Sequence, residues 1–308
     1  MRALGSPVGV SGAGRHDGRH DRSGRPAGRY GSPVRVSGVV ERAEGFGPHD
    51  HVCLVYRDDA ELLDMTRRFL SDGLAQGLQV HCLGGPHLDE LKDDLGALET
   101  RPGAVGFGDL EMGYAPGATG GPADQVHAYA SATEAALADG FAGLRVVAEA
   151  TPLVLTPEER SVFARYEHLI DRYMTSHPFS AMCAYDGTRL APDAVAEIAC
   201  MHPNTSRGAT PFRLHAHPSA GAALAGEIDL FSRELLADAL DRADLPVIAG
   251  EIVIDATALD FIDHRGMLVL ADLARRGGAT VVLRTARRAP RKLLEMMDID
   301  GVRVEPPA

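Results

Sequence analysis

HVCLVYRDDAELLDMTRRFLSDGLAQGLQVHCL, residues 51–83, decides the fold class of the first half of the chain. It joins a short apolar run, an amphipathic segment and a second short apolar run. The middle segment repeats leucine and phenylalanine at helical spacing, and Asp58 or Asp59 can cap its first turn. This order predicts strand, helix and parallel strand, the unit from which mainly parallel sheets are built.

The same alternation continues beyond residue 83. Apolar runs predict strands near 104–107, 143–148 and 180–185, with helices between them. Thr156 before Pro157 marks a helix start, because proline is favoured at the first helical position. The first domain is therefore predicted as an α/β domain with a mainly parallel sheet.

The polar, proline-flanked stretch at residues 202–211 predicts a domain boundary. The hundred residues that follow predict a smaller αβ sandwich. Its elements are two strands, FRLHAH and GAALAG, a helix at about 230–241 capped by Asp229, a strand EIVIDA, a helix after DHRG, a strand TVVLRT, a helix after Pro290 and a final strand VRVE.

Residues 1–44 differ from the rest of the chain. They are rich in glycine, arginine and serine and lack apolar periodicity, so a disordered leader is expected, with an over-extended start site as the alternative. The expected organisation is leader 1–44, first domain 45–206 and second domain 207–308.

Composition excludes several classes of protein. The formal charge of −12 argues against a nucleic-acid partner, because such proteins present a concentrated basic face. No apolar run approaches the roughly 18 residues that cross a bilayer, so no membrane contact and a cytoplasmic location are expected. The four cysteines form no CxxC pair, so reduced, buried thiols are expected.

Known catalytic motifs are absent from the sequence. A phosphate-binding loop needs G-x-x-x-x-G-K-[ST], but Lys92 and Lys292 follow no such pattern and YRDDAE stands after the first strand. GFGPHD and GFGDLE lack the third glycine of a dinucleotide-binding loop, and H-E-x-x-H and G-x-S-x-G do not occur. We expect no enzymatic activity and no cofactor; the alternative is an unusual nucleotide-binding or hydrolysing enzyme.

Histidines and cysteines on the predicted strands raise the question of a metal site. Side chains alternate along a strand, so His51 and Cys53 share one face of the sheet while His81 and Cys82 point to opposite faces. Buried cysteines and hydrogen-bonded histidines are therefore favoured, and no metal is expected. The residues considered are His49, His51, Cys53, His81, Cys82, Cys183 and His202.

The segment at 51–83, followed in order by RYEHLID, MCAYD and MHP, resembles the MEDS sensory domain over about residues 49–204. The resemblance implies a fold similar to RecA-type ATPases without their phosphate loop, and a sensory role. Ligands of open α/β sheets bind beyond the carboxyl ends of the strands. A small-molecule crevice is expected there, formed by Tyr56, Glu149, Thr151, Tyr185 and Asp186; the alternative is packing and helix capping.

Residues 212–304 resemble a STAS domain of the anti-sigma factor antagonist type. The segments LAGEIDL, EIVIDATALDFIDHRGMLVLADLARRGGATVVL and RKLLEMMDIDG carry this resemblance. It implies that the turn at the start of the helix docks an anti-sigma factor or an anti-sigma serine kinase. The residues expected at this partner surface are Asp229, Asp263, His264, Arg265, Gly266 and Met267.

Switched members of that family carry a Ser or Thr phosphoacceptor after the helix-capping Asp. Here His264 occupies that position, and an imidazole is no substrate for a serine kinase. Asp263 can still cap the helix, with Gly266 allowing a close approach and Met267, Leu268 and Leu270 packing inward. We therefore expect a regulatory binding protein controlled by its sensory domain; the alternative is a scaffold or dimerisation module, so self-association stays open.

Overall fold

The structure is a computed structural model that describes residues 35, 37–86, 88–99, 101–110 and 121–307. Residues 35–308 form one compact unit. Most of the predicted leader, residues 1–34, lies outside the described residues. Within the described part of the chain, no helix is long and apolar enough to span a membrane.

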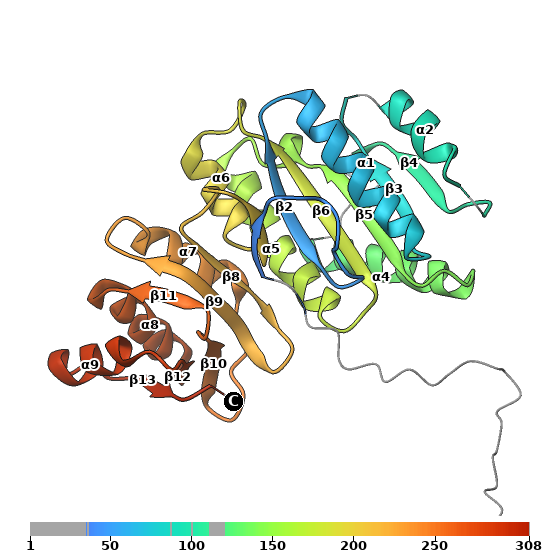
Figure 1. Ribbon diagram of the computed structural model, residues 1–308. Helices are drawn as coiled ribbons and strands as arrows, with labels where there is room; N and C mark the ends of the chain where they lie inside the picture. The colour runs from blue at the N-terminus through green and yellow to red at the C-terminus, as the bar shows by residue number, and fades with distance from the viewer. Residues whose placement is uncertain (1–34, 36, 87, 100, 111–120, 308) are drawn as a thin grey trace, which may run out of the picture. The chain divides into compact units, whose positions relative to one another are not determined.

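Seven parallel strands form the first sheet, in the order β1-β7-β2-β6-β5-β3-β4 (Figure 1). All five strands predicted before residue 202 are present. The strands are β1 Gly38–Val40, β2 His51–Tyr56, β3 Gln79–Leu83, β4 Val105–Gly108, β5 Leu144–Glu149, β6 Phe179–Asp186 and β7 Asn204–Ser206.

The two short outer strands correct the sequence analysis. Residues 38–40, placed in the disordered leader, form β1, and β7 lies in the stretch taken for a polar boundary. Gly38 pairs with Asn204, and Val52 pairs with Asn204 on the other side. These strands have three residues each, so they depend on pairing with the sheet and carry no apolar periodicity of their own.

Helices cover both faces of this sheet (Figure 1). Even-numbered residues of β2, such as Leu54, face α1 and α2, whereas Cys53 faces the cluster that includes α4 and α5. The helices are α1 Asp59–Ala75, α2 Leu88–Gly96, α4 Pro122–Ala138, α5 Pro157–Met174 and α6 Pro192–Ala199, with a 3-10 turn at Thr151–Leu153.

The predicted helix starts of this domain are confirmed. The carboxylate of Asp58 accepts a hydrogen bond from the backbone N of Glu61 at 2.8 Å and caps α1. Thr156 and Glu159 form a capping box at the start of α5, with Pro157 as its first residue. These local signals lie within one helical turn, so the sequence displays them directly.

The second sheet has the order β11-β9-β10-β12-β13, with β8 antiparallel to β9 (Figure 1). The remaining pairs are parallel. Its elements are β8 Phe212–His217, β9 Ala220–Ile228, α7 Arg233–Ala243, β10 Glu251–Asp255, β11 Leu259–Ile262, α8 His264–Gly277, β12 Thr280–Arg284, α9 Arg288–Met297 and β13 Val302–Glu305.

Two features of this domain differ from the prediction. β11 replaces a connecting loop; its Leu259 and Ile262 are buried while the two residues between them are exposed, so strand alternation is missing. The N-cap of α7 is Ser232 instead of Asp229. The Asp229 carboxylate accepts from the backbone N of Phe231 and of Ser232, which forms a turn before the helix.

The two sheets share one apolar core, which includes Tyr129 of α4 and Leu283 of β12. The backbone N of Leu214 in β8 donates to the carbonyl of Cys200 at 2.6 Å. The carboxylate of Asp171, in α5, accepts from the backbone N of Ala216 at 2.7 Å. Helix α5 therefore contacts the second sheet through its buried face.

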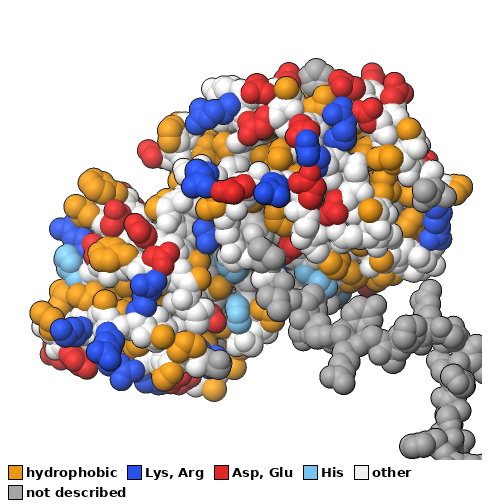
Figure 2. All heavy atoms as spheres, viewed as in Figure 1, with side chains coloured by type: hydrophobic (Ala, Val, Ile, Leu, Met, Phe, Trp, Pro, Cys, Tyr) orange, Lys and Arg blue, Asp and Glu red, His pale blue; other side chains and the backbone are white. Residues whose placement is uncertain are grey.

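Acidic and basic side chains are interspersed over the face of the first domain seen in Figure 2. Pairs such as Arg68 with Asp64, four residues apart along α1, are about half exposed. Exposed pairs of this kind typically contribute about 0–1 kcal/mol. The stability of the domain therefore rests on its core and its buried polar groups.

Lowering the pH is expected to destabilise the fold through His215. Burial lowers the pKa of this imidazole to about 4; Arg35 and Arg213 act in the same direction, and Asp171 opposes them. Between about pH 6.5 and 4 the unfolded chain binds a proton that the folded chain does not. The free energy of unfolding therefore falls as the pH drops through this window, by up to about 3 kcal/mol for this group.

Urea unfolding of the wild type and of His215→Gln between pH 7.5 and 4 measures this contribution. The variant lacks the titrating group, so its stability should depend less steeply on pH. Burial also lowers the pKa values of His168 and His202 to about 4, so these two groups leave part of the pH dependence of the same sign in the variant. Parallel pH profiles for the two proteins would show that the assignment to His215 is wrong.

Candidate functional site

The turn before α8 is built as the sequence predicts. The Asp263 carboxylate accepts from the backbone N of Gly266 at 2.8 Å, and the helix begins at His264. The side chains of His264 and Arg265 are exposed. The backbone N of Asp263 donates to the carbonyl of Ile228 at 3.0 Å, so the loop at 229–232 lies beside this turn.

Two residues expected at the partner surface are instead buried. Met267 is fully buried, and Gly266 lies on the face of α8 that packs against Ile228 and Ile262, so neither is available to a partner. Leu268, expected to pack inward, is 47 % exposed, whereas Leu270 is buried as expected. The difference follows from helical phase: Met267 and Leu270 are three residues apart on one face, and Leu268 is turned about 100° away from Met267.

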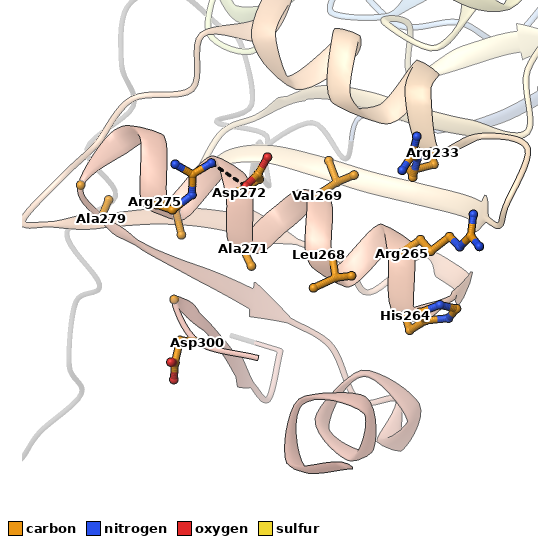
Figure 3. A pocket seen from close by; sticks show the side chains of 13 residues that line it. Arg233, His264, Arg265, Leu268, Val269, Ala271, Asp272, Arg275, Ala279 and Asp300 are labelled. Atoms are coloured by element: carbon orange, nitrogen blue, oxygen red, sulfur yellow. Dashed lines mark hydrogen bonds and ion pairs between the residues drawn. The ribbon is translucent and has the colours of Figure 1, made fainter. Parts of the chain in front are cut away.

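A groove of about 790 Å³ runs along the exposed side of α8 (Figure 3). Arg233 of α7 lies beside Arg265 at one end, and Asp300 lies at the other. Leu268 and Val269 supply apolar surface between charged side chains. Arg233 and Leu268 were not predicted to line this surface; the helical phase set by the buried Met267 and Leu270 was the available signal for the exposure of Leu268.

A side chain at Gly266 is expected to destabilise the packing of α8 on the sheet. A Cβ at this position would lie 2.7 Å from the Ile228 Cγ2 and the Ile262 Cγ1. Gly266→Ala is therefore expected to lower the free energy of unfolding by about 1–3 kcal/mol, because either the helix or these two isoleucine side chains must move.

Gly277→Ala, in the last turn of the same helix, is the matched control. Its Cβ would meet Ile252 Cδ1 at 3.5 Å, an ordinary contact. Alanine is the better helix former, so this change should be neutral or stabilise by up to about 1 kcal/mol. Urea unfolding of both variants tests the prediction; equal effects would contradict the close approach at Gly266.

Four of the five predicted ligand-binding residues meet at the carboxyl ends of β2, β5 and β6. The hydroxyl of Tyr56 donates to Glu149 Oε1 at 3.3 Å, and the hydroxyl and backbone N of Thr151 donate to the same oxygen. The backbone N of Asp186 donates to Thr151 Oγ1 at 2.8 Å. The Asp186 carboxylate itself accepts from Thr188, so it holds a turn together.

Tyr185 does not join this group, which corrects the prediction. Side chains alternate along β6, so Tyr185 points to the opposite face from its neighbours. It is buried at 1 % exposure, and its hydroxyl donates to Glu167 Oε1 of α5 at 2.7 Å.

A second group of polar side chains surrounds the Glu167 carboxylate in the interior of the protein. His51, Glu167, Cys183 and His202 are fully or almost fully buried, and one ligand atom from each lies within 4.8 Å of the others. Glu167 Oε2 lies 3.1 Å from His51 Nε2, 3.6 Å from His202 Nε2 and 3.7 Å from Cys183 Sγ. The Cys183 Sγ lies 3.7 Å from His51 Nε2.

Hydrogen bonds orient both imidazoles from behind. His51 Nδ1 lies 3.0 Å from the Asp171 carboxylate, and His202 Nδ1 lies 3.1 Å from the carbonyl of Ile198. Both partners can only accept, so each Nδ1 carries a hydrogen and each Nε2 faces Glu167. Among the described residues, His202 Nε2 has no hydrogen-bond partner.

The charges of this group are strongly coupled. Burial would raise the pKa of Glu167, but the histidines and the hydrogen bonds from His51 and Tyr185 lower it. Burial would lower the pKa of His51, but the hydrogen bonds to Asp171 and Glu167 raise it. Burial and the nearby His51 lower the pKa of His202 to about 4. At neutral pH, Glu167 is therefore charged and His202 is neutral.

His51, Cys183 and His202 were among the residues considered for a metal site from the sequence, whereas Glu167 was not. It follows Phe163 by four residues and precedes Ile170 by three, so it occupies the apolar stripe of α5. An acidic residue within an apolar helical stripe was the available signal for a buried carboxylate. Two other histidines considered for a metal site lie elsewhere: His49 hydrogen-bonds the carbonyl of Met174, and His81 packs against Gly106.

Fold and site define an α/β protein with two sheets, a polar group at the edge of the first sheet and an exposed helical turn beside the second. The family model for the methanogen/methylotroph, DcmR sensory domain, MEDS, matches residues 50–203, half of the 308-residue chain. The chain belongs to the MEDS family, which indicates a signalling role. No curated protein matches the chain.

Proposed function

We propose that the chain is a regulatory signalling protein whose MEDS domain is coupled to a STAS domain of the anti-sigma factor antagonist type. The second domain docks an anti-sigma factor or an anti-sigma serine kinase, and the chain has no catalytic activity of its own. The observation that carries the proposal is the Asp263-capped start of α8, where His264, Arg265 and Leu268 are exposed.

Charge and apolar surface at this turn favour a protein partner. Arg233 and Arg265 lie together beside the first turn of α8 (Figure 3), where the N-terminal end of the helix adds positive potential. Phe231, in the adjoining loop, is 90 % exposed. An exposed aromatic beside arginines has the composition of a binding hot spot, and the partner surface should carry acidic groups around an apolar pocket.

Regulation through the first domain is part of the proposal. His264 replaces the phosphoacceptor of switched STAS domains, so phosphate cannot be placed there by a serine kinase. Helix α5 connects the domains, since Asp171 accepts from the backbone of β8. A small molecule bound beside Tyr56, Glu149 and Thr151 is the proposed input. No phosphate loop follows β2, where Asp58 instead caps α1.

Capture from a lysate of the organism that encodes the chain tests the proposal. Tagged full-length protein is used as bait, and bound proteins are identified by mass spectrometry. Leu268→Asp places a carboxylate on the docking surface, whereas Val162→Asp changes a 59 % exposed valine on α5 and is the matched control.

The expected result is an anti-sigma factor or serine kinase retained by the wild type and Val162→Asp and lost with Leu268→Asp. Absence of such a protein from the wild-type bait would remove the proposed function. Equal retention by Leu268→Asp would place the contact elsewhere.

A further inference from the structure

We propose that His51, Glu167, Cys183 and His202 form a binding site for a divalent transition-metal ion of the Zn²⁺ class. The four side chains come from β2, α5, β6 and the segment between α6 and β7. Sequence-distant segments thus place two imidazoles, a carboxylate and a thiol within 4.8 Å of one another in the interior. This site is separate from the sheet edge and from the α8 turn.

The spacing fits four-coordinate geometry. A tetrahedron with ligand distances of about 2.0–2.3 Å has edges of roughly 3.3–3.8 Å. The four ligand-atom distances given by the structure are 3.1, 3.6, 3.7 and 3.7 Å. The other two distances, from His202 Nε2 to His51 Nε2 and to Cys183 Sγ, are at most 4.8 Å, so an ion can bind between these atoms once the His202 side chain moves toward them.

Hydrogen bonds from outside the site orient the proposed ligands as they do in zinc proteins. Zinc-binding histidines donate their second ring N–H to a carboxylate or a backbone carbonyl, and His51 and His202 do so to Asp171 and to Ile198. The remaining oxygen of Glu167, Oε1, accepts from the Tyr185 hydroxyl at 2.7 Å. Three of the four ligands, His51, Glu167 and His202, are thus held in place by a group outside the proposed site.

An ion also resolves an unfavourable contact. The buried His202 Nε2 faces Glu167 Oε2 at 3.6 Å, beyond hydrogen-bond distance, and has no hydrogen-bond partner among the described residues. A divalent cation there would accept a lone pair from each of these two atoms. Two neutral imidazoles, a thiolate and a carboxylate sum to −2 and neutralise the ion, while Arg35 neutralises Asp171.

Cobalt substitution tests the site in the full-length protein. The reduced chain is stripped with a chelator and titrated with Co²⁺, and Zn²⁺ content after reloading is measured by mass spectrometry. The expected result is one ion per chain, with the intense visible bands of four-coordinate cobalt and a near-ultraviolet thiolate-to-cobalt band. Added Zn²⁺ should abolish these bands by displacement.

Cys183→Ser should remove the thiolate band and weaken Co²⁺ binding at least tenfold. Cys82→Ser, which changes a buried cysteine of β3 outside the group, is the matched control and should bind as the wild type does. Glu167→Gln replaces Cys183→Ser if circular dichroism shows that the latter is unfolded. The proposal would be overturned if the wild type did not bind stoichiometric Co²⁺ or Zn²⁺. It would also be overturned if Cys183→Ser and Glu167→Gln left the binding unchanged. Either result would favour an internal ion-pair network.

Discussion

Asp171→Ala is expected to lower the free energy of unfolding by about 3–5 kcal/mol. The carboxylate is fully buried and accepts hydrogen bonds from Arg35, from His51 Nδ1 at 3.0 Å and from the backbone N of Ala216 at 2.7 Å. Its loss leaves the Arg35 guanidinium and two N–H groups without this acceptor in a site closed to water. Breaking a buried ion pair from one side has a cost of this size.

Urea unfolding at pH 7.5 measures this change, and Asp64→Ala is the control. Asp64 also pairs with an arginine, Arg68, but both side chains are about half exposed. The control should therefore lose no more than about 0.5 kcal/mol. A loss below about 1 kcal/mol for Asp171→Ala would show that the group contributes little to the contact between α5 and β8.

Phe231→Ala is expected to weaken binding of the captured partner about 30-fold or more. The ring is 90 % exposed, so its removal leaves no cavity in the fold. A partner that covers it gains apolar burial, and hot-spot aromatics lose about 2 kcal/mol or more when truncated. That energy corresponds to a factor of about 30 in Kd.

Isothermal titration with the purified partner provides the measurement. Met296→Ala, at a 78 % exposed side chain on α9, is the control and should keep the wild-type Kd. An unchanged Kd for Phe231→Ala would contradict the placement of the docking surface at the loop before α7 and the first turn of α8.

Local patterns in the sequence were sufficient for most of the fold. β2 matches its predicted range, because a six-residue apolar run followed by a capped helix leaves little ambiguity. β1, β7 and β11 were missed because they have three or four residues and exist through pairing with neighbouring strands. Such strands are defined by tertiary structure, which periodicity does not report.

The candidate sites likewise combine features that local sequence patterns predict with features that only the tertiary structure defines. The cap at Asp263 and the meeting of Tyr56, Glu149 and Thr151 at one sheet edge follow from helix capping and from parallel-strand geometry. Tyr185 was assigned to the wrong face, although alternation with Asp186 would have placed it correctly. The group around Glu167 combines four distant segments, and only the folded chain brings them together.

The most direct test of the account is titration of the full-length chain with its proposed partner, an anti-sigma serine kinase of the organism that encodes it, with and without ATP. Wild type and His264→Ser should bind equally without ATP. With ATP, wild type should stay bound and unphosphorylated, whereas His264→Ser should acquire phosphate at residue 264 and dissociate. Failure of the wild type to bind the kinase, or its own phosphorylation between residues 257 and 267 with loss of binding, would contradict the account.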